Sequence, residues 1–320
     1  MLFFDHSSAF NTIIPSTLTT KLEHLGLSPS LRQWLSNFLN GRPHAVRMGI
    51  HVSASLTLNT GASQGCVLSP LLYSMYMYDC VATTNSTTII KFTDDTVVVR
   101  LISDNNEMAY LEEIRNLEIW CQRNNLLLNV SKTKELIVDF STKQERSYHT
   151  PVINESPVER VDSFRYLCVH IMQDLLWSCH INTMVKKARQ RLYHPRHLRD
   201  FRLPSKVLRN FYSCTIESIL TGNIATWFGN STMQDRRVLQ RVVRSAEHII
   251  CTKLPDLHSI YSKRCWAKAR KVMKDLSHPN NGLFSLLWSG KCFRSLKANT
   301  ERLRRSFFPQ AIQTLNQNST

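Results

Sequence analysis

Residues 89–99 read IIKFTDDTVVV, two runs of mostly β-branched and aromatic residues separated by a pair of aspartates. Such flanks are typical of buried strands, whereas adjacent carboxylates oppose burial. One interpretation is a solvated hairpin turn, because Asp tolerates turn geometry and bonds to its own backbone. The other is a metal site at the bend, served by Asp94 and Asp95 together. Because neighbouring strand residues point to opposite faces, such a site needs a third carboxylate from elsewhere.

The composition of the chain excludes several classes of protein. With 320 residues, 42% of them hydrophobic, it can bury the core of one large or two modest domains. No apolar run is long enough to span a bilayer, and the N-terminus MLFFDHSSAFNTII lacks the basic start of a signal peptide. The nine cysteines include no Cys-x-x-Cys pair, which favours reduced thiols. We therefore expect a protein of the nucleus and cytoplasm without a membrane partner.

The charge of the chain is unevenly distributed. Residues 1–180 hold 14 Lys and Arg against 17 Asp and Glu, whereas residues 181–320 hold 26 against 7. A near-neutral half joined to a strongly basic half indicates a module that binds a polyanion, with nucleic acid as the favoured partner. The alternative is a soluble helical domain that is merely rich in charge. A membrane-binding arm would more often be short and amphipathic.

The pattern of apolar residues predicts an α+β module followed by an all-helical one. Up to about residue 175 it predicts strands at 2–4, 135–140 and 164–171, hairpins at 44–60 and 89–99, and helices at 16–27, 28–38, 69–79 and 108–117. Ser69 and Pro70 suit an N-cap and a first helical residue. From about residue 178 the period is helical, with stripes at 181–192 and 238–249, and Pro195 is expected to kink or stop the first helix.

Asp5 is the candidate for the third carboxylate. It ends a short apolar strand about ninety residues before the aspartate pair. Three carboxylates at strand ends can bind two Mg²⁺ ions, which activate an attacking hydroxyl and neutralise charge on a leaving phosphate. Without a cation the three would repel one another, and at least one would tend to stay protonated.

Five stretches in order carry a resemblance to a known family. They are FFDHSSAFNTI (3–13), GASQGCVLSPLLYS (61–74), KFTDDTVVV (91–99), LLLNVSKTK (126–134) and FRYLCVHI (164–171). Together they resemble successive motifs of the reverse transcriptases of non-LTR (LINE-type) retrotransposons. The resemblance implies a right-hand polymerase fold, with a palm built on a small antiparallel sheet at 1–175, a helical thumb-like domain at 176–252 and a basic helical C-terminal tail at 253–320.

The activity implied by the resemblance is RNA-directed DNA polymerisation. Two Mg²⁺ ions, with Mn²⁺ as the alternative metal, would serve the addition of deoxynucleotides to a primer 3′-OH. The implied partners are an RNA template, a DNA primer and deoxynucleoside triphosphates. The fingers of the family are expected upstream of the first catalytic motif, with which this chain begins. The alternative is therefore a catalytically inactive retrotransposon remnant that binds RNA or DNA through its basic helical half.

The resemblance assigns roles to four charged residues. Asp5 would be the first metal-binding carboxylate, with the Phe4 carbonyl beside it; Asp94 would bridge the two metals, and Asp95 would assist. Lys132 lies where a lysine could protonate the leaving pyrophosphate as a general acid. A solvated surface lysine fits this last position equally well.

Three further residues would meet the incoming nucleotide. Phe10 falls where the family places a bulky residue against the ribose 2′ position, so that deoxynucleotides are preferred. Gln64 and Gly65 match the loop that touches the nucleotide and template, where Gly allows close backbone approach. The alternatives are a core phenylalanine and an ordinary turn glycine.

Arg237, Arg241 and Arg244 lie at i, i+4 and i+7, off the apolar stripe of their helix. As nucleic-acid-binding residues they would follow phosphates, giving affinity and salt dependence with little sequence preference. The alternative is a solvated helix face. The segment at 164–171 would be the hairpin that grips the primer strand.

The chain departs from the family pattern at several positions, none of them a metal ligand. Asn11 replaces an Asp, Ser63 a Pro and Thr93 an Ala. Cys168 replaces a Gly and adds a Cβ at a position where Gly would allow a positive φ.

Overall fold

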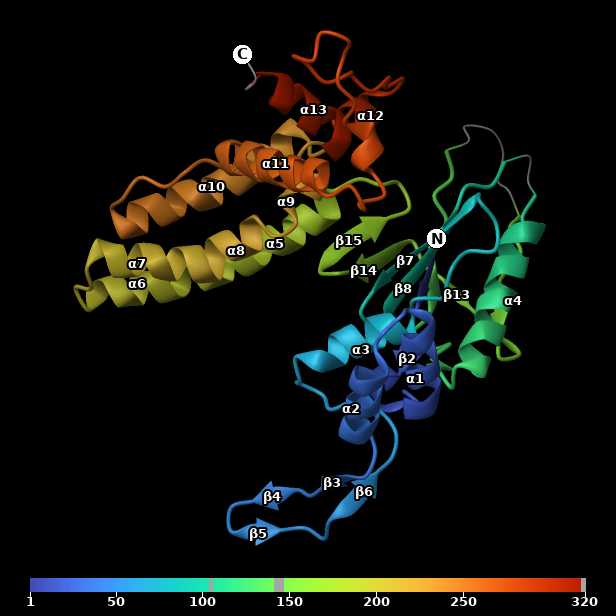
Figure 1. Cartoon of the computed structure of the whole chain (residues 1–320). Coiled ribbons are helices and arrows are strands. Elements are labelled where there is room, and N and C mark those ends of the chain that lie inside the picture. Colours follow the sequence, from blue (N-terminus) through green and yellow to red (C-terminus); the bar gives the residue numbers. More distant parts are fainter. Residues whose placement is uncertain (104–105, 141–146, 318–320) are drawn as a thin grey trace. The chain divides into compact units, whose positions relative to one another are not determined.

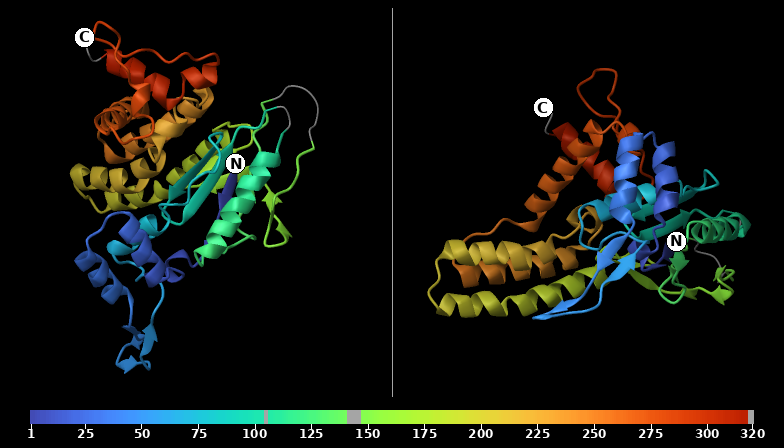
Figure 2. Two further views of the ribbon diagram at one scale, coloured as in Figure 1. Left: turned by 45° about the vertical axis from the view of Figure 1, so that its right-hand side comes forward. Right: turned by 60° about the horizontal axis from the view of Figure 1, so that its bottom comes forward.

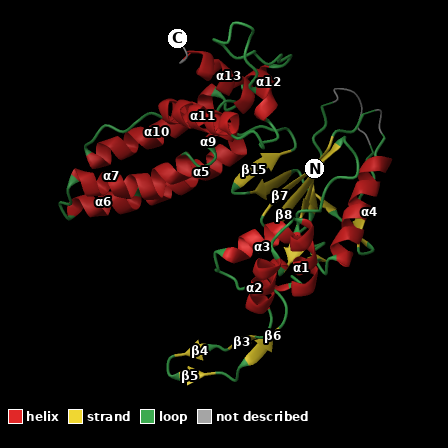
Figure 3. Ribbon diagram, viewed as in Figure 1, coloured by secondary structure: helices red, strands yellow, loops and turns green. Residues whose placement is uncertain are grey.

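The structure is a computed structural model that describes residues 1–103, 106–140 and 147–317 (Figure 1). The chain forms two compact units, unit 1 from Met1 to Asp162 and unit 2 from Ser163 to Thr320. Unit 1 combines a sheet with helices, whereas unit 2 is helical apart from one hairpin and an isolated bridge (Figure 3). The predicted α+β class is confirmed.

Unit 1 is built on a five-stranded sheet in the order β13-β10-β1-β8-β7. Its strands are β1 (Leu2–Phe4), β7 (Thr87–Phe92), β8 (Asp95–Arg100), β10 (Lys134–Glu135) and β13 (Glu159–Arg160). The apolar flanks of the aspartate pair form the β7–β8 hairpin, and β1 runs antiparallel to both β8 and β10. The pairing of β10 with β13 is parallel, so the sheet is mixed rather than purely antiparallel.

Four α-helices and a one-turn 3₁₀ helix complete the core of unit 1. They are η1 (Ala9–Asn11), α1 (Pro15–His24), α2 (Pro29–Leu39), α3 (Leu68–Tyr76) and α4 (Met108–Arg123). Their apolar faces pack with β1 and β8 in one cluster, which includes Leu2, Leu22, Tyr73, Val98 and Ile114. This burial fixes the central strands, because Leu2–Phe4 of β1 and Val97 and Val98 of β8 are almost wholly excluded from water.

Short two-stranded ladders surround the sheet. They pair β2 (His6–Ser7) with β9 (Leu127–Leu128), β3 (Arg42–His44) with β6 (Leu56–Leu58), β4 (Arg47–Met48) with β5 (His51–Val52), and β11 (Val152–Ile153) with β12 (Ser156–Pro157). The β3–β6 and β4–β5 ladders make the predicted hairpin, which extends beyond α2 as an exposed arm (Figure 1).

Unit 2 begins with the hairpin β14 (Ser163–Tyr166) and β15 (Val169–Met172) and continues as helices. The helices are α5 (Ser178–Arg191), α6 (Tyr193–Asp200), α7 (Ser205–Tyr212), the π-helix η2 (Ser213–Glu217), α8 (Ser218–Leu220), α9 (Ile224–Trp227), α10 (Met233–Ile250), α11 (Leu257–Lys274), η3 (Asn281–Leu283), α12 (Glu301–Arg304) and α13 (Phe307–Gln317). The long helix α10 packs against α5, α6 and α7, alongside which it runs in both views of Figure 2.

The division into units differs from the predicted boundaries at 175/176 and 252/253. The β14–β15 hairpin belongs to unit 2, since the His170 amide donates to His180 Nδ1 and Asn223 Nδ2 donates to the Leu167 carbonyl. One helix, α11, supplies Tyr261 to the core around α10 and Val272 to the core beneath α13. The predicted thumb-like domain and tail are therefore packed into one unit, and their functional names stay predictions.

Three local expectations also need correction. The strand predicted at 135–140 pairs only over Lys134–Glu135. Ser69 is not an N-cap, because α3 starts at Leu68 and the buried Ser69 hydroxyl donates to the Ser63 carbonyl at 2.5 Å. The predicted helix break falls at Leu192, so Pro195 occupies the first turn of α6, where an N–H has no intrahelical partner.

The turn between β14 and β15 is strained. Leu167 and Cys168, its two central residues, have φ angles of 45° and 67°. Positive φ at both positions is the geometry of a type I′ hairpin turn, which favours Gly because a Cβ crowds the backbone there. The structure thus gives the physical reason for a glycine at the position that Cys168 occupies.

Cys168→Gly should stabilise the protein. Relief of about 1–2 kcal/mol of left-handed strain exceeds the roughly 0.5–1 kcal/mol lost to the greater freedom of Gly in the unfolded chain. Urea unfolding should therefore show a net gain of about 0.5–1 kcal/mol. Cys168→Ala is the control, since it removes the thiol but keeps the Cβ. Equal stabilities of the Gly and Ala variants would contradict the account.

Candidate functional site

The pairing of β1 with β8 brings two of the predicted carboxylates together. Its register pairs Leu2 with Val98 and Phe4 with Thr96. Asp5 directly follows Phe4 and Asp95 directly precedes Thr96, so both aspartates adjoin the last pair of this register. Side chains at directly opposed positions of an antiparallel pair have Cβ atoms about 4.5–5.5 Å apart. Residues some ninety positions apart in sequence therefore meet at one end of the central strands.

The third carboxylate lies in the two-residue turn that joins β7 to β8. This turn consists of Thr93 and Asp94, and Thr93 has a φ of 51°, a strained value for a β-branched residue. The exposed Asp94 side chain accepts a hydrogen bond from the Thr93 hydroxyl at 2.8 Å. The structure thus confirms a hairpin turn at the aspartate pair, and it also places the pair beside Asp5.

A buried histidine supports the turn from beneath. His6 Nδ1 donates to the Asp94 carbonyl at 3.0 Å, and its Nε2 lies 3.8 Å from the Cys121 sulfur. Burial lowers the pKa of His6, against the opposing influence of the Asp94 carbonyl and of the nearby carboxylates. His6 is therefore a neutral ring that fixes the turn. Sequence reasoning missed it, and its position directly after Asp5 was the available signal.

The electrostatics of this site indicate surplus negative charge. The pKa of Asp95 is raised by burial first, and then by the charges of Asp94 and Asp5. Asp5 Oδ2 is buried and makes no hydrogen bond. Such an oxygen is costly unless a cation compensates it.

Lys132 supplies one such cation. Its ammonium lies 3.7 Å from Asp5 Oδ2 and is itself largely exposed. The backbone explains this closeness, because the Asn129 amide donates to the Asp5 carbonyl and the Asp5 amide donates to the Thr133 hydroxyl. The segment that carries Lys132 is thereby fixed next to the end of β1.

The donor set fits a hard divalent cation. Carboxylate oxygens are the ligands that Mg²⁺ prefers, and the unbonded Asp5 oxygen and the repulsion at Asp95 both fit added positive charge. Throughout residues 1–103, 106–140 and 147–317, no three His, Cys, Asp or Glu side chains are already gathered into a metal-binding group. Asp94 is turned to Thr93, so binding by all three carboxylates requires its side chain to move.

Phe10 lies beside the loop that contains Gln64 and Gly65. Its half-buried ring packs on Tyr73, with centroids 5.2 Å apart. The Ala62 amide donates to the Phe10 carbonyl at 2.7 Å. A Cβ on Gly61 would lie 2.8 Å from Asn11 Cα, so this glycine permits the close approach of the loop to η1.

Gln64 and Gly65 lie at the exposed tip of that loop. Gly65 has a φ of 80°, and a Cβ there would meet no atom within 4 Å. Its glycine is explained by backbone conformation alone. Arg42, which sequence reasoning missed, positions the loop by donating to the Thr60 and Gly61 carbonyls at 2.6 and 2.7 Å. The only signal in the sequence was an arginine between Gly41 and Pro43.

Tyr73 is a third residue that the sequence did not reveal. Its hydroxyl is buried without a hydrogen-bond partner, and burial followed by the charge of Asp94 raises its pKa. The hydroxyl is therefore protonated at neutral pH. Tyr73 supports the ring of Phe10, and its position in an apolar helix face marked it only as core.

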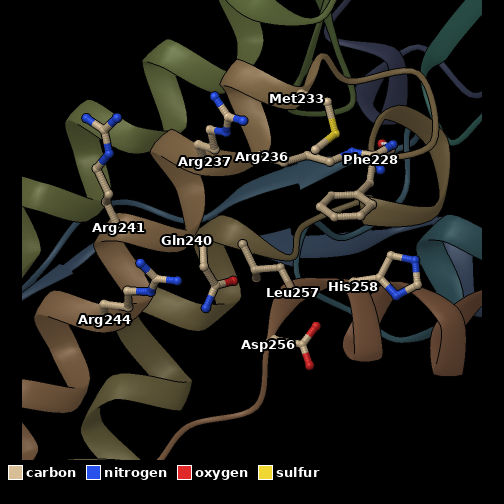
Figure 4. A pocket seen from close by; sticks show the side chains of 10 residues that line it. All are labelled: Phe228, Met233, Arg236, Arg237, Gln240, Arg241, Arg244, Asp256, Leu257 and His258. Atoms are coloured by element: carbon tan, nitrogen blue, oxygen red, sulfur yellow. Dashed lines mark hydrogen bonds between the residues drawn. The ribbon is translucent and has the colours of Figure 1, made fainter.

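The three arginines lie on α10 in unit 2 and are exposed. They line a pocket of about 490 Å³ together with Gln240 (Figure 4). Asp256, Leu257 and His258, at the start of α11, line it as well. The arginines belong to unit 2 and the three carboxylates to unit 1.

Comparison with known proteins identifies the family. The profile of the family "Reverse transcriptase (RNA-dependent DNA polymerase)" matches residues 1–171, so the chain belongs to that family. A second profile, "Alkylated DNA repair protein alkB homolog 8, N-terminal", matches residues 177–218. The polymerase match contains Asp5, Asp94 and Asp95.

Curated relatives narrow the class to reverse transcriptases of the non-LTR, LINE-type retrotransposons. The chain is 27% identical over 205 residues to the probable RNA-directed DNA polymerase from transposon X-element of Drosophila melanogaster, covering 60% of this chain and 21% of that protein. It is 24% identical to the probable RNA-directed DNA polymerase from transposon BS of D. melanogaster, with 71% of this chain and 26% of that protein covered. It is 28% identical to the RNA-directed DNA polymerase from mobile element jockey of Drosophila funebris, with 59% of this chain and 21% of that protein covered. The chain spans about a fifth to a quarter of these relatives.

The chain also matches a solved structure, that of telomerase from Candida albicans in complex with a TWJ fragment of telomeric RNA. The match covers 87% of this chain and 49% of the telomerase chain. The TM-score is 0.38 and the identity 11%. Among the described residues, no helix has the length and apolar character needed to cross a membrane.

Asp95→Asn should stabilise the metal-free protein at pH 7. The pKa of Asp95 in the folded protein is raised above its ordinary value. The folded protein therefore loses stability as the pH rises and Asp95 becomes ionised. Removing the charge should gain about a few tenths of a kcal/mol, because water screens this half-exposed group. Thermal unfolding in chelator should show the gain shrinking as the pH falls toward 4. Glu112→Gln, an exposed carboxylate on α4, is the control; an equal or larger gain for that variant would contradict the assignment.

Proposed function

We propose that this chain carries the catalytic carboxylates of an RNA-directed DNA polymerase that adds deoxynucleotides to a primer 3′-OH. The observation that carries the proposal is the register of β1 with β8, whose last pair, Phe4 and Thr96, adjoins Asp5 and Asp95 beside the Asp94 turn. A membership of the reverse transcriptase family supports it.

Asp5, Asp94 and Asp95 would hold divalent metal, Mg²⁺ or Mn²⁺. When bound, these ions would lower the pKa of the primer hydroxyl and neutralise charge on the phosphate. The unbonded Asp5 oxygen and the mutual repulsion of the carboxylates are the features of this chain that suit such ions. His6 would hold the Asp94 turn in place through its carbonyl.

Lys132 would act as the proton donor for the leaving pyrophosphate. Its ammonium is held near Asp5 by the 129–133 segment, yet it is exposed enough to reach a substrate. A positioned acid next to the developing charge accelerates departure of the leaving group.

Phe10 would exclude a ribose 2′-hydroxyl, with Tyr73 behind it preventing the ring from retreating. Gln64 and Gly65 would contact the nucleotide and template from the loop that Arg42 positions. The RNA template, DNA primer and deoxynucleoside triphosphates are the proposed substrates.

Unit 2 would bind the nucleic acid. Residues 181–320 hold 26 basic against 7 acidic residues, and Arg237, Arg241 and Arg244 are exposed along one face of α10. This observation also favours the second candidate function, a catalytically inactive remnant that binds RNA or DNA through its helical half.

Primer extension on an RNA template distinguishes the two candidates. With Mg²⁺ and deoxynucleotides, the chain should extend the primer, and the Asp94→Ala/Asp95→Ala variant should lose at least about 100-fold in rate. Both proteins should bind the primer–template equally, since binding is assigned to unit 2. Extension with ribonucleotides should rise in Phe10→Ala but not in Phe38→Ala, an aromatic control elsewhere in unit 1. Equal binding with no extension by either protein would establish the remnant instead.

A further inference from the structure

The arginine face of α10 belongs to a longer basic groove. Arg244 lines the 490 Å³ pocket shown in Figure 4 and also a second pocket of about 670 Å³. The second pocket is lined from α6 by Arg196 and Arg199. We use the name basic groove for the two pockets that share Arg244; its guanidinium groups come from Arg196, Arg199, Arg237, Arg241 and Arg244.

The five arginines of the groove outnumber the two carboxylates that line the same pockets, Asp200 at the end of α6 and Asp256 at the start of α11. Across the described residues, none of its five arginines forms an ion pair with an Asp or Glu. Arg236, by contrast, donates to the Phe228 and Gly229 carbonyls and so has its partners inside the protein. Five unpaired arginines on one surface suit a ligand with several negative charges.

The two walls of the groove differ in charge. In Figure 4, Arg237, Arg241 and Arg244 follow α10, while Asp256 and Leu257 come from the start of α11. The Asp256 carboxylate accepts from the Ser259 amide and hydroxyl as the helix N-cap, so it is fixed on its wall. A phosphate is attracted to the α10 wall and repelled from the α11 wall.

We propose that the basic groove holds a single strand of RNA or DNA, with its phosphates along α10 and its bases toward α11. This inference rests on the proposed binding of nucleic acid by unit 2 and specifies which form is bound. Arg237 and Arg244 are seven residues apart, which is about 10.5 Å along a helix. That length is about three steps of 3.4 Å, the axial spacing between phosphates within each strand of double-stranded DNA.

The charges and side chains that line the groove favour a single strand over a duplex. A duplex presents two phosphate backbones, one on each side of its grooves, so its second backbone would face Asp256. The bases of a duplex are also stacked and paired inside it. The bases of a single strand are free to stack on ring side chains, which this pocket offers on the α11 wall at the exposed His258.

Fluorescence anisotropy with labelled oligonucleotides of about 12 nucleotides tests the proposal. The probes are single-stranded DNA, RNA of the same sequence, and the corresponding DNA duplex. Both single strands should bind about tenfold more tightly than the duplex at physiological salt. Their affinity should fall with salt at a log–log slope of about −3, the value for four to five phosphate contacts at −0.7 each.

Variants assign the binding to this groove. Arg244→Gln should weaken single-strand binding most, by about tenfold, and reduce the salt slope by about 0.7, because Arg244 borders both pockets. Arg209→Gln, an exposed arginine of α7 that lines neither pocket, is the matched control. Asp256→Ser keeps a side-chain N-cap but removes the negative charge from the α11 wall. It should therefore raise the affinity for the duplex and reduce the preference for single strands over the duplex.

The outcomes separate this inference from the proposed function. Binding of the duplex at least as tightly as the single strands, unchanged by Asp256→Ser, would overturn the inference and leave nucleic-acid binding by unit 2 intact. Equal loss in Arg244→Gln and Arg209→Gln would also overturn it, because the groove would then have no special part. Failure of the chain to bind any of the three probes would overturn both proposals.

Discussion

The antiparallel pairing of β1 with β8 is the constraint on which unit 1 depends. A shift of this register by one residue would turn every side chain of β1 to the other face of the sheet. Leu2 and Val98 are wholly buried in the same core, so such a shift would expose apolar surface and is strongly disfavoured. The hydrophobic core thereby fixes the strand register at Phe4 and Thr96, the neighbours of Asp5 and Asp95. The positions of these aspartates thus depend on packing at residues several positions along each strand.

The same site contains several features that oppose stability. Thr93 has a positive φ, burial and the neighbouring carboxylates raise the pKa of Asp95, and Asp5 and Tyr73 carry buried polar atoms without hydrogen bonds. Costs of this kind persist where the surrounding structure over-determines the local one. Here the surroundings include the buried His6 below the turn and the hydrogen bonds from Arg42 to the Thr60 and Gly61 carbonyls. These supports are polar, directional and distant in sequence.

Much of this arrangement could be predicted from the sequence, and the exceptions share a cause. The hairpin at the aspartate pair and the helices around 108–117 and 238–249 follow strong local periodicity, and all three are present. The family follows from five ordered motifs, since each depends on short-range residue identity. The strand at 135–140 failed because a local apolar run does not say how many partners the sheet offers it. Likewise His6 and Arg42 act through backbone carbonyls of residues far along the chain, and side-chain-to-carbonyl bonds leave no periodic signal. The unit boundary moved for the same reason, since the His170–His180 bond joins a hairpin to a helix.

Binding of Mn²⁺, followed by the electron paramagnetic resonance signal of the free ion, tests the central claim that these carboxylates form one cation site. The account predicts that the chain binds Mn²⁺ and that Asp5→Asn and Asp95→Asn each lose this binding. Each substitution removes one of the three carboxylates and leaves the site with too little negative charge. Glu112→Gln should bind like the unaltered chain. Equal Mn²⁺ binding by the unaltered chain and both aspartate variants, or no binding by any of them, would contradict the account.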